Sequence, residues 1–398
     1  MNITIRGLDN SNKKIRDIWL PMEEKHLQEM CNDLGIEMTT EANCYIENSI
    51  DSNFQKIFNN QYCNIDELNY LAKRLDGFSA NETKRFYAAA HTENPETIAE
   101  LINLSFNIHC YSLITDFSDL HRVGKDLYLS EKQAVASREL DELDGESYAM
   151  NVIKDNSSPI ITPYGVLYKN SNAPEQVYNS KQFPPYQWKE TITTVQLTSK
   201  GENEYIYLPC SDIEIEKALM RLETPYLHDC EIAIDNHSFH DRILNIVFAD
   251  TIPVIKVDSL NNIAKCYREM GNHDIWWFEK LIDYAKPRTI DEVLALADSM
   301  HEFELFDGIK DIESYGRYMI CESGRFEYDP NLEEYIDFKR YGREKMAQED
   351  GAFSNEGYII YHGYNQKLAN LLFENLGIMI PEEIGINQNQ IMGGIKFE

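Results

Sequence analysis

The segment IDELN at residues 65–69 recurs as VDSLN at residues 257–261, and LAK at 71–73 recurs as IAK at 263–265. Both pairs are separated by the same offset of 192 residues, and apolar positions are kept more often than identical residues. The same offset joins Pro95 with Pro287, Thr97 with Thr289, Gly124 with Gly316 and Gly165 with Gly357. A constant offset over about a hundred residues indicates an internal duplication rather than chance.

The duplication sets the expected domain boundaries. Toward the N-terminus the offset is 188 residues, because IWLP at 18–21 recurs as IYLP at 206–209. We expect four parts, which are repeat 1 at 1–170, a connector at 171–190, repeat 2 at 191–363 and a C-terminal tail at 364–398. The connector contains Pro174, Pro184 and Pro185, which is typical of an extended segment.

Hydrophobic periodicity in repeat 2 predicts small sheets on either side of a helical middle. The strands expected from alternating residues are 193–198, 204–208, 230–234, 302–306 and 357–361. The expected helices begin after Ser211 and at Asp241, and continue as 257–270, 273–285, 289–300, 309–322 and 330–346. Ser211 and Glu214 fit a capping box, and the tail carries a further helix, 366–376, that ends before Gly377. The predicted fold class is α+β, as an elongated chain of small sub-domains repeated twice.

The composition indicates a folded and strongly anionic protein. The 398 residues include 67 acidic and 37 basic ones, a net charge of −30, while 43% are hydrophobic and 11% are aromatic. Such a chain can bury a core, but its charge would repel phosphates, so direct nucleic-acid binding is not expected. There is no run of about 18 apolar residues and no signal peptide, and the eight cysteines are scattered singly. We therefore expect a cytoplasmic protein with reduced thiols and no membrane contact.

The sequence carries no motif of a nucleotide-binding or hydrolytic site. It lacks a glycine-rich phosphate loop and the G-x-S-x-G nucleophile elbow. The best candidates for metal ligands are His237, His240, Asp241 and Cys230. We expect His237 in a turn rather than on a helix, and the matching stretch of repeat 1, around 49–53, contains no histidine.

One cysteine has histidines nearby in the sequence. Cys110 follows His109 and precedes His121, as a nucleophile and its base would. Repeat 2 replaces this region with 301–303, His-Glu-Phe, and no third, orienting residue is evident. We therefore expect no enzyme, no cofactor and no bound metal. A metal-dependent enzyme is the alternative that His237 and His240 leave open.

Acidic residues are concentrated in repeat 2. Repeat 1 has 27 acidic and 16 basic residues, and repeat 2 has 34 and 17. In the stretch 289–337, fourteen acidic residues stand against three basic ones, Lys310, Arg317 and Arg325. Charge of one sign on a folded scaffold costs self-repulsion, so a basic partner surface is expected to compensate for it. Thirty net charges match those on about 50 Å of duplex DNA, so a DNA-binding groove is a suitable partner.

The end of repeat 2 carries a recognisable motif. Residues 335–338 read Tyr-Ile-Asp-Phe, 341–344 read Tyr-Gly-Arg-Glu, and 351–357 read GAFSNEG. This segment resembles the closing motif of the ArdA antirestriction proteins of conjugative elements and phages. The helix around Leu260 and the segment 311–319 fit the same family. The resemblance covers repeat 2 and extends more weakly over repeat 1.

The resemblance implies a DNA mimic without catalytic activity. ArdA-like proteins are elongated, acidic mimics of bent B-form DNA that occupy the DNA groove of type I restriction–modification enzymes, chiefly the methyltransferase core. Typical members act as dimers joined through the last sub-domain. The implied partner is a type I methyltransferase/nuclease complex or another DNA-binding defence protein, bound by a homodimer or a single-chain pseudo-dimer. An acidic regulatory module that binds another basic host protein is the alternative. Repeat 1 departs from the motif, with Leu143, Asp144 and Gly145 at the positions of Tyr335, Ile336 and Asp337.

We expect acidic residues of repeat 2 to take the place of DNA phosphates. The target-facing candidates are Asp291, Glu292, Asp298, Glu304, Asp307, Asp311, Glu313, Asp329, Glu333, Glu334 and Asp337. The aromatic residues of the motif recur every three positions, which would place them on one helix face. The residues expected in the core or in a subunit contact are Tyr335, Phe338, Tyr341 and Gly342.

Overall fold

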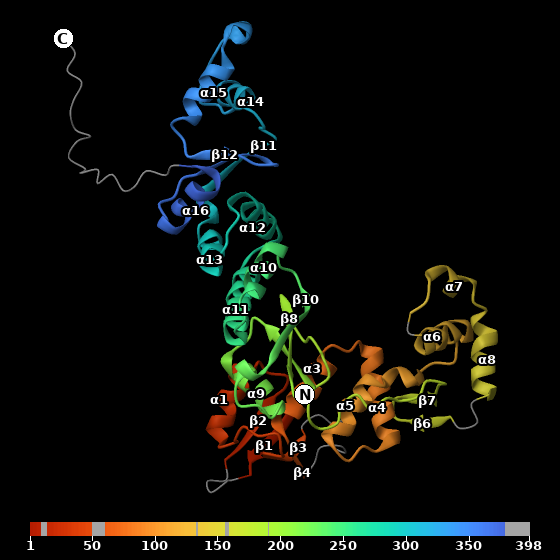
Figure 1. Cartoon of the computed structure of the whole chain (residues 1–398). Coiled ribbons are helices and arrows are strands. Elements are labelled where there is room, and N and C mark those ends of the chain that lie inside the picture. Colours follow the sequence, from red (N-terminus) through yellow and green to blue (C-terminus); the bar gives the residue numbers. More distant parts are fainter. Residues whose placement is uncertain (9–13, 50–59, 133, 156–158, 190, 379–398) are drawn as a thin grey trace. The chain divides into compact units, whose positions relative to one another are not determined.

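The computed structural model describes residues 1–8, 14–49, 60–132, 134–155, 159–189 and 191–378. The chain forms two compact units, Met1–Asn236 and His237–Glu398 (Figure 1). The fold is α+β, because the described residues form four small sheets of three or four strands among many helices. The predicted fold class is confirmed, while the elongated arrangement and the repeat boundaries stay predictions.

Repeat 1 begins with an antiparallel sheet in the order β2-β1-β3-β4. Its strands are β1 (Asn2–Gly7), β2 (Ile15–Trp19), β3 (Cys44–Ser49) and β4 (Gln61–Cys63). Alternate residues of β1 are buried, including Ile3 and Ile5, as expected when one face of a sheet is covered. Helix α1 (Glu24–Leu34) packs against this core with Leu27 and ends at Gly35, whose left-handed backbone (φ 67°) glycine adopts without strain.

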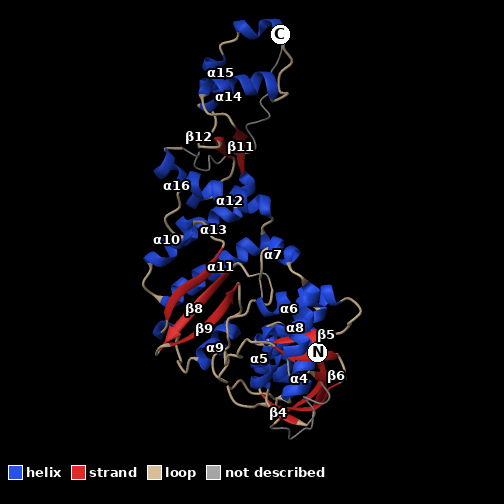
Figure 2. Cartoon of the chain, turned by 90° about the vertical axis from the view of Figure 1, so that its right-hand side faces the viewer, coloured by secondary structure: helices blue, strands red, loops and turns tan. Residues whose placement is uncertain are grey.

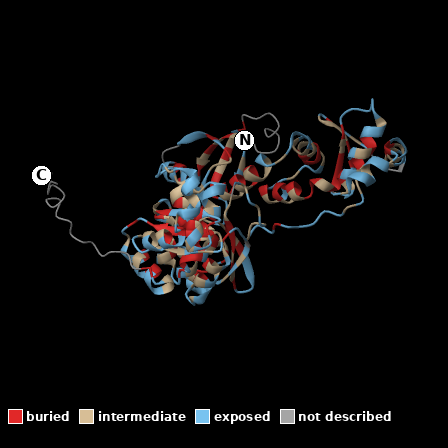
Figure 3. Ribbon diagram, turned by 90° about the horizontal axis from the view of Figure 1, so that it is seen from above, coloured by how far each residue is buried: buried red, intermediate tan, exposed pale blue. Residues whose placement is uncertain are grey.

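Three helices form the middle of repeat 1. They are α3 (Ile65–Asp76), α4 (Ala80–Glu93) and α5 (Ile98–Phe106). Each begins after a residue whose side-chain oxygen accepts a hydrogen bond from a first-turn backbone N–H, which satisfies a donor that the helix itself cannot pair. These capping residues are Asn64, Ser79 and Thr97. Buried residues line the faces on which helices and sheets meet (Figure 3).

A second sheet closes repeat 1. Its order is β5-β7-β6, from β5 (Tyr111–Ile114), β6 (Ile160–Thr162) and β7 (Gly165–Lys169), after the short turn η1 (Ile108–Cys110). The helices beside it are α6 (Leu120–Lys132), α7 (Ser137–Glu142) and α8 (Gly145–Asp155). Helices α6 and α8 touch at Gly124 and Gly145, where a Cβ on Gly124 would lie 1.7 Å from the Gly145 carbonyl oxygen. Only glycine permits this approach.

The first sub-domain of repeat 2 lies in the same compact unit as repeat 1. Its elements are β8 (Thr193–Ser199), β9 (Glu202–Leu208), α9 (Asp212–Arg221), η2 (Leu227–Asp229) and β10 (Glu231–His237). The sheet order is β10-β8-β9, with α9 beside β9 (Figure 2). Helix α9 also contacts α1 of repeat 1. In this contact the ammonium group of Lys217 lies 2.9 Å from Glu24 and 2.5 Å from Asp66.

The connector packs against repeat 1. In its described residues, 171–189, there is no helix or strand, as expected for an extended segment. Tyr178 is buried, and Phe183 stacks on Tyr70 with ring centroids 4.4 Å apart. The Tyr70 hydroxyl donates to the carbonyl of Pro184 (2.6 Å).

Helices make up the first part of the second unit. They are α10 (Asp241–Ala249), α11 (Pro253–Glu269), α12 (Asn272–Ala285), α13 (Ile290–Asp298) and, from the tail, α16 (Gln366–Leu376). Helix α16 contacts α12 and α13, with Leu368 and Leu372 buried. It ends at Gly377 in the left-handed conformation (φ 70°), so the predicted tail helix is confirmed. The rest of the predicted tail, from residue 379, lies outside the described residues.

The last sub-domain of repeat 2 combines a sheet with a pair of crossing helices. After the turn η3 (Met300–Glu302), the sheet has the order β11-β13-β12, from β11 (Phe303–Asp307), β12 (Gly351–Phe353) and β13 (Gly357–Tyr361). The helices are α14 (Ile312–Arg317) and α15 (Phe338–Met346). A Cβ on Gly316 would lie 2.0 Å from the Phe338 carbonyl oxygen, and one on Gly342 would lie 2.1 Å from that of Ile312. The two helices are therefore held together at glycine.

Two predicted helices of this sub-domain are interrupted. The segment 330–346 forms a 3₁₀ helix, η5 (Pro330–Tyr335), and then α15. It breaks because the Asp337 carboxylate accepts a hydrogen bond from the Arg340 backbone (2.9 Å) and so begins a new helix. The segment 309–322 begins as a helix only after the cap Asp311, and it changes at Tyr318 into a π-helical turn, η4 (Tyr318–Glu322).

The closing sheets of the two predicted repeats share their strand order and register. In repeat 1 Ile114 faces Val166, and 192 residues later Phe306 faces Tyr358. Within the terminal motif the shift is 193 residues. The backbone N–H of Ser147 donates to Asp144, as that of Arg340 donates to Asp337. Asp144, rather than Gly145, thus takes the place of Asp337, one residue away from the match expected from the sequence.

Candidate functional site

The eleven predicted target-facing acids all lie in the second unit. Asp291, Glu292 and Asp298 belong to α13, Glu304 and Asp307 to β11, Asp311 and Glu313 to the start of α14, Asp329, Glu333 and Glu334 to η5 and its cap, and Asp337 to the start of α15. Nine of the side chains are exposed, and Glu292 and Glu333 are half-buried. The contacts of these acids divide them into three groups.

Four of the acids hold the beginnings of helices. Their carboxylates accept hydrogen bonds from backbone N–H groups: Glu292 from Arg288 (2.7 Å), Asp311 from Ser314 (2.8 Å), Asp329 from Asn331 (3.0 Å) and Asp337 from Arg340 (2.9 Å). Negative charge is also favourable near the positive end of a helix dipole. The hydrogen bond from the Ser314 backbone lowers the pKa of Asp311. We call these four residues the capping acids, and their first role is local structure.

Three further acids contact basic side chains on the surface. Asp291 lies 3.1 Å from Lys367, Glu304 lies 3.0 Å from His362, and Glu333 contacts Arg317. All six side chains are at least one-third exposed, and exposed pairs contribute only about 0–1 kcal/mol to stability. Each lysine or arginine in these pairs offsets part of the negative charge.

The remaining four acids have no partner. The side chains of Asp298, Asp307, Glu313 and Glu334 are exposed and make no hydrogen bond or ion pair with the part of the chain that the structure describes. We call them the free acids. No local structural role explains these carboxylates, and they are available to a cationic partner.

The motif residues have different surroundings. Phe338 is buried, and Gly342 packs against the backbone of Ile312. Tyr341 is half-buried and lies edge-on to Phe326, with ring centroids 6.0 Å apart. Tyr335 does not join them, because it ends η5 and its side chain is 81% exposed. The aromatic residues therefore do not share one helix face.

The candidate metal ligands have other positions than expected. His237 lies in strand β10, so its prediction in a turn is wrong. His240 caps α10, because its Nδ1 accepts from the Arg242 backbone (3.1 Å), and its Nε2 lies 3.2 Å from Asp283. Among the described residues, no three His, Cys, Asp or Glu side chains are grouped to hold a metal ion.

Cys110 does lie beside a histidine. Its Sγ is 3.5 Å from Nε2 of His109, while His121 is exposed on α6. Burial raises the pKa of the Cys110 thiol, which keeps it protonated, whereas a nucleophile needs a lowered pKa. All eight cysteines are free, and six of them are buried.

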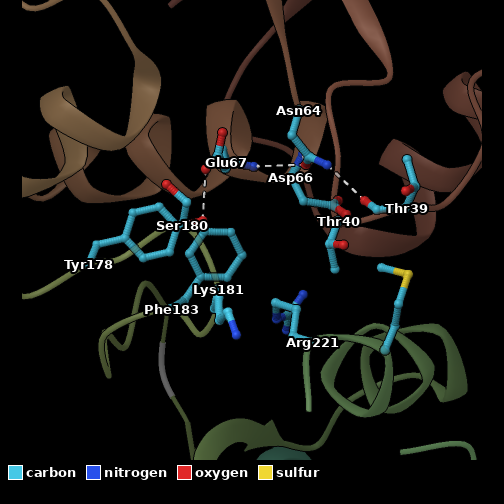
Figure 4. A pocket seen from close by; sticks show the side chains of 11 residues that line it. Thr39, Thr40, Asn64, Asp66, Glu67, Tyr178, Ser180, Lys181, Phe183 and Arg221 are labelled. Carbon is cyan, nitrogen blue, oxygen red and sulfur yellow. Dashed lines mark hydrogen bonds between the residues drawn. The ribbon is translucent and has the colours of Figure 1, made fainter. Parts of the chain in front are cut away.

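A pocket of the first unit lies between the connector and the first sub-domains of both repeats (Figure 4). Its space is about 250 Å³, including a part open to solvent. Tyr178 donates to Glu67 at one wall (2.8 Å), and Arg221 pairs with Glu204 at another (3.2 Å). Tyr178 and Arg221, which line the pocket, thus each contact a glutamate, and the sequence did not predict this pocket.

One known protein family matches the part of the chain that contains the eleven candidate acids. Residues 200–360 match the model of the family described as antirestriction protein (ArdA). This region, about two-fifths of the chain, is similar to the ArdA family. The matched residues include all eleven acids and the four motif residues, so the ArdA resemblance of repeat 2 is confirmed. No curated protein matches the chain, and none of the described helices is both long and apolar enough to cross a bilayer.

Proposed function

We propose that the protein blocks a type I restriction–modification enzyme, or a related DNA-binding defence nuclease, by imitating DNA in the bacterial cytoplasm. The main support is that residues 200–360, which match the ArdA family model, contain the four free acids, whose exposed carboxylates have no partner in the described chain. The inhibitor needs no cofactor and performs no chemistry. It protects incoming mobile DNA by occupying the groove in which the defence enzyme would bind DNA.

The free acids suit this role physically. Asp298, Asp307, Glu313 and Glu334 leave their oxygens open to lysine and arginine side chains, as the phosphates of DNA do. A groove lined with basic residues attracts such a surface over long distances and speeds association. Because exposed charges are screened by salt, binding weakens as ionic strength rises.

We also propose that the chain is a tandem duplication of the ArdA unit. Support comes from the shared sheet orders, β5-β7-β6 and β11-β13-β12, and from the glycine contacts between helices in both repeats. A single chain would then hold two ArdA-like units, as a pseudo-dimer.

The test is neutralisation of the free acids. The variant D298N/D307N/E313Q/E334Q removes four charges, and the control D298E/D307E/E313D/E334D keeps them at the same positions. We expect the neutral variant to inhibit a type I enzyme about tenfold less well or worse, since each charged contact contributes on the order of 1 kcal/mol, while the control inhibits like the wild type. Full inhibition by a folded neutral variant would refute mimicry through these residues.

The alternative is an acidic module that binds another basic host protein. A pull-down from a bacterial lysate separates the two proposals. DNA mimicry requires a restriction complex in the captured fraction, and excess duplex DNA must displace it. A captured basic protein that DNA does not displace would favour the alternative.

A further inference from the structure

We infer that repeat 1 is a brace for repeat 2 and not a second target-binding arm. Two observations carry the inference: repeat 1 holds the connector and the first sub-domain of repeat 2 by specific contacts, and it has no acid at most of the positions that match the eleven candidate acids of repeat 2. The second part rests on the proposed function of those acids. The first part stands on the contacts alone.

Two asparagines of repeat 1 bind the connector backbone. The Asn103 side chain accepts from the N–H groups of Val177 (2.8 Å) and Tyr178 (2.9 Å) and donates to the Tyr178 carbonyl (2.7 Å). Asn107 accepts from the N–H of Glu175 (2.8 Å) and donates to its carbonyl (2.7 Å). Each amide thus pairs with both polar groups of a connector residue. Extended backbone without a sheet partner would otherwise need water.

Side chains fix the rest of the connector. Phe183 lies between Tyr70 and Tyr178, with centroid distances of 4.4 and 5.3 Å, and the Arg221 guanidinium lies 4.9 Å from its ring. Trp188 donates to Asp76 (2.9 Å). Aromatic stacking and cation–π contacts add to apolar burial here.

The first sub-domain of repeat 2 is held by charge. Lys217 of α9 is 3% exposed, and its ammonium group contacts two carboxylates of repeat 1, Glu24 and Asp66. Lys73 lies 2.6 Å from Glu24 and completes the cluster. Burial alone would lower the pKa of Lys217, but Asp66 and Glu24 raise it. A buried cation requires such partners, and repeat 1 supplies them.

The residues that hold the connector are particular to repeat 1. At the matching positions of repeat 2, 192 residues later, the side chains are different: Asn103 corresponds to Ala295, Asn107 to Ser299, Tyr70 to Asn262 and Arg74 to Cys266. Arg74 lies over the ring of Tyr186 in the connector, at 4.9 Å. These four connector-binding residues are therefore not repeated in repeat 2.

Most of the candidate acids of repeat 2, in contrast, have no acidic counterpart in repeat 1. Three capping acids are kept in repeat 1: Glu292 corresponds to Glu100, Asp311 to Asp119 and Asp337 to Asp144. Seven others are replaced by uncharged residues or histidine. At the 192-residue offset these are Asp291 by Ala99, Asp298 by Phe106, Glu304 by Ser112, Asp307 by Thr115 and Glu313 by His121. At the 193-residue offset, which relates the helix caps Ala136 and Asp329, they are Asp329 by Ala136 and Glu333 by Leu140. Among the free acids only Glu334 has an acidic counterpart, Asp141. Repeat 1 keeps acids that build the fold and lacks most of those that face solvent unpaired.

Hydrogen exchange of the full chain tests the brace. The variant N103A/N107A removes the hydrogen bonds to the connector, and K217M removes the ion pairs with Glu24 and Asp66. The control K25M removes an exposed lysine. We expect N103A/N107A to speed exchange at 175–178 and also in α9 about tenfold or more, because a lost hydrogen-bond set frees the backbone it held. K217M should speed exchange in α9 and the connector, and K25M in neither. Faster exchange confined to 175–178, with α9 unchanged in both variants, would overturn the brace.

Inhibition assays test the second part. The variant E29Q/E37Q/E41Q/D141N neutralises four exposed acids of repeat 1 that make no side-chain contacts in the described chain. We expect it to keep inhibition within about twofold, while the neutral free-acid variant loses about tenfold or more. Equal losses in both variants would show that repeat 1 also contacts the target and would overturn the inference. A wild type that inhibits no restriction enzyme would refute the proposed function, and hydrogen exchange would still decide the brace.

Discussion

Lys217 and Glu24 are 193 positions apart in the sequence, yet their charged atoms lie 2.9 Å apart with side chains that are 4% and 13% exposed. One residue belongs to repeat 2 and the other to repeat 1. Burial of two charges is costly, and their attraction offsets this cost only when the geometry is good. Here Asp66 and Lys73 add further contacts, so every charge of the cluster has an opposite neighbour.

Replacing Lys217 by methionine should destabilise the first unit strongly. The substitution leaves Glu24 and Asp66 buried without their shared cation, and breaking one partner of a buried ion pair costs about 3–5 kcal/mol. Urea unfolding followed by far-ultraviolet circular dichroism measures the change. Replacing the exposed Lys25 should change stability by less than about 0.5 kcal/mol. If K217M destabilised the protein by as little as the Lys25 variant, the cluster would not be a stabilising contact.

The cluster should also make stability depend on pH. Burial by itself would raise the pKa of Glu24, but the charges of Lys73 and Lys217 lower it to about 2, from an ordinary value of 4.5. Because the folded pKa is depressed, the stabilisation is complete above pH 4.5 and is lost as the pH falls toward 2. The difference in unfolding free energy between wild type and E24Q should therefore shrink by about 2 kcal/mol between pH 5 and pH 3. A difference that stays constant over this range would contradict the assignment.

The glycine contact between α14 and α15 should not tolerate a side chain. In G342A the new Cβ would lie 2.1 Å from the Ile312 carbonyl oxygen, so the helices must separate. Overpacking of this kind costs about 1–3 kcal/mol. Hydrogen exchange should speed up in α14 and α15 and stay unchanged in α3 to α5. The control is G271S, since a Cβ at Gly271 meets nothing closer than 3.5 Å. Unchanged exchange in G342A would mean that the crossing adapts.

Capping and free acids should respond differently to substitution. D337A removes the acceptor of the Arg340 N–H and should cost about 1 kcal/mol, whereas D337N keeps an acceptor and should cost little. D307A removes an unpaired carboxylate and should stay within about 0.5 kcal/mol of the wild type. Thermal unfolding curves of the three variants give these values. Equal stability of D337A and D307A would remove the distinction.

Much of the fold of repeat 2 was predictable because local patterns decide it. Strand 357–361 and helix 366–376 agree residue for residue with the structure. The Glu214 carboxylate accepts from the backbone N–H of Ser211 (2.8 Å), as the capping box predicts. Each of these signals lies within a few residues of the element it controls.

The interruption at Asp337 was missed for a physical reason. Apolar spacing continues through 330–346, so the period alone favours one helix. The Asp337 carboxylate instead caps the start of a second helix, α15. A search for capping residues, made before the apolar spacing was considered, would have predicted this break. The Asp311 cap of α14 carries a similar local signal, with Ser314 three positions later.

The functional reading from sequence treated the eleven acids as one set. The hydrogen bonds of capping acids and the ion pairs of Asp291, Glu304 and Glu333 depend on neighbours brought by folding, such as Lys367, 76 positions from Asp291. The ion cluster of Lys217 with Glu24 and Asp66 could not be predicted from the sequence for the same reason. Lys217 reads as an ordinary solvated lysine in α9, and its partners are 193 and 151 positions away.

The ion cluster also bears on how such a gene can change. Its cation is encoded in the second copy and two of its carboxylates in the first. A stop codon or a recombination event between the two halves would leave either Lys217 or its partners Glu24 and Asp66 without an opposite charge. We therefore expect selection against separating the two halves, even if only one of them contacts the target proposed above. Under the proposed duplication, two copies that were once redundant would now depend on each other for their charge balance.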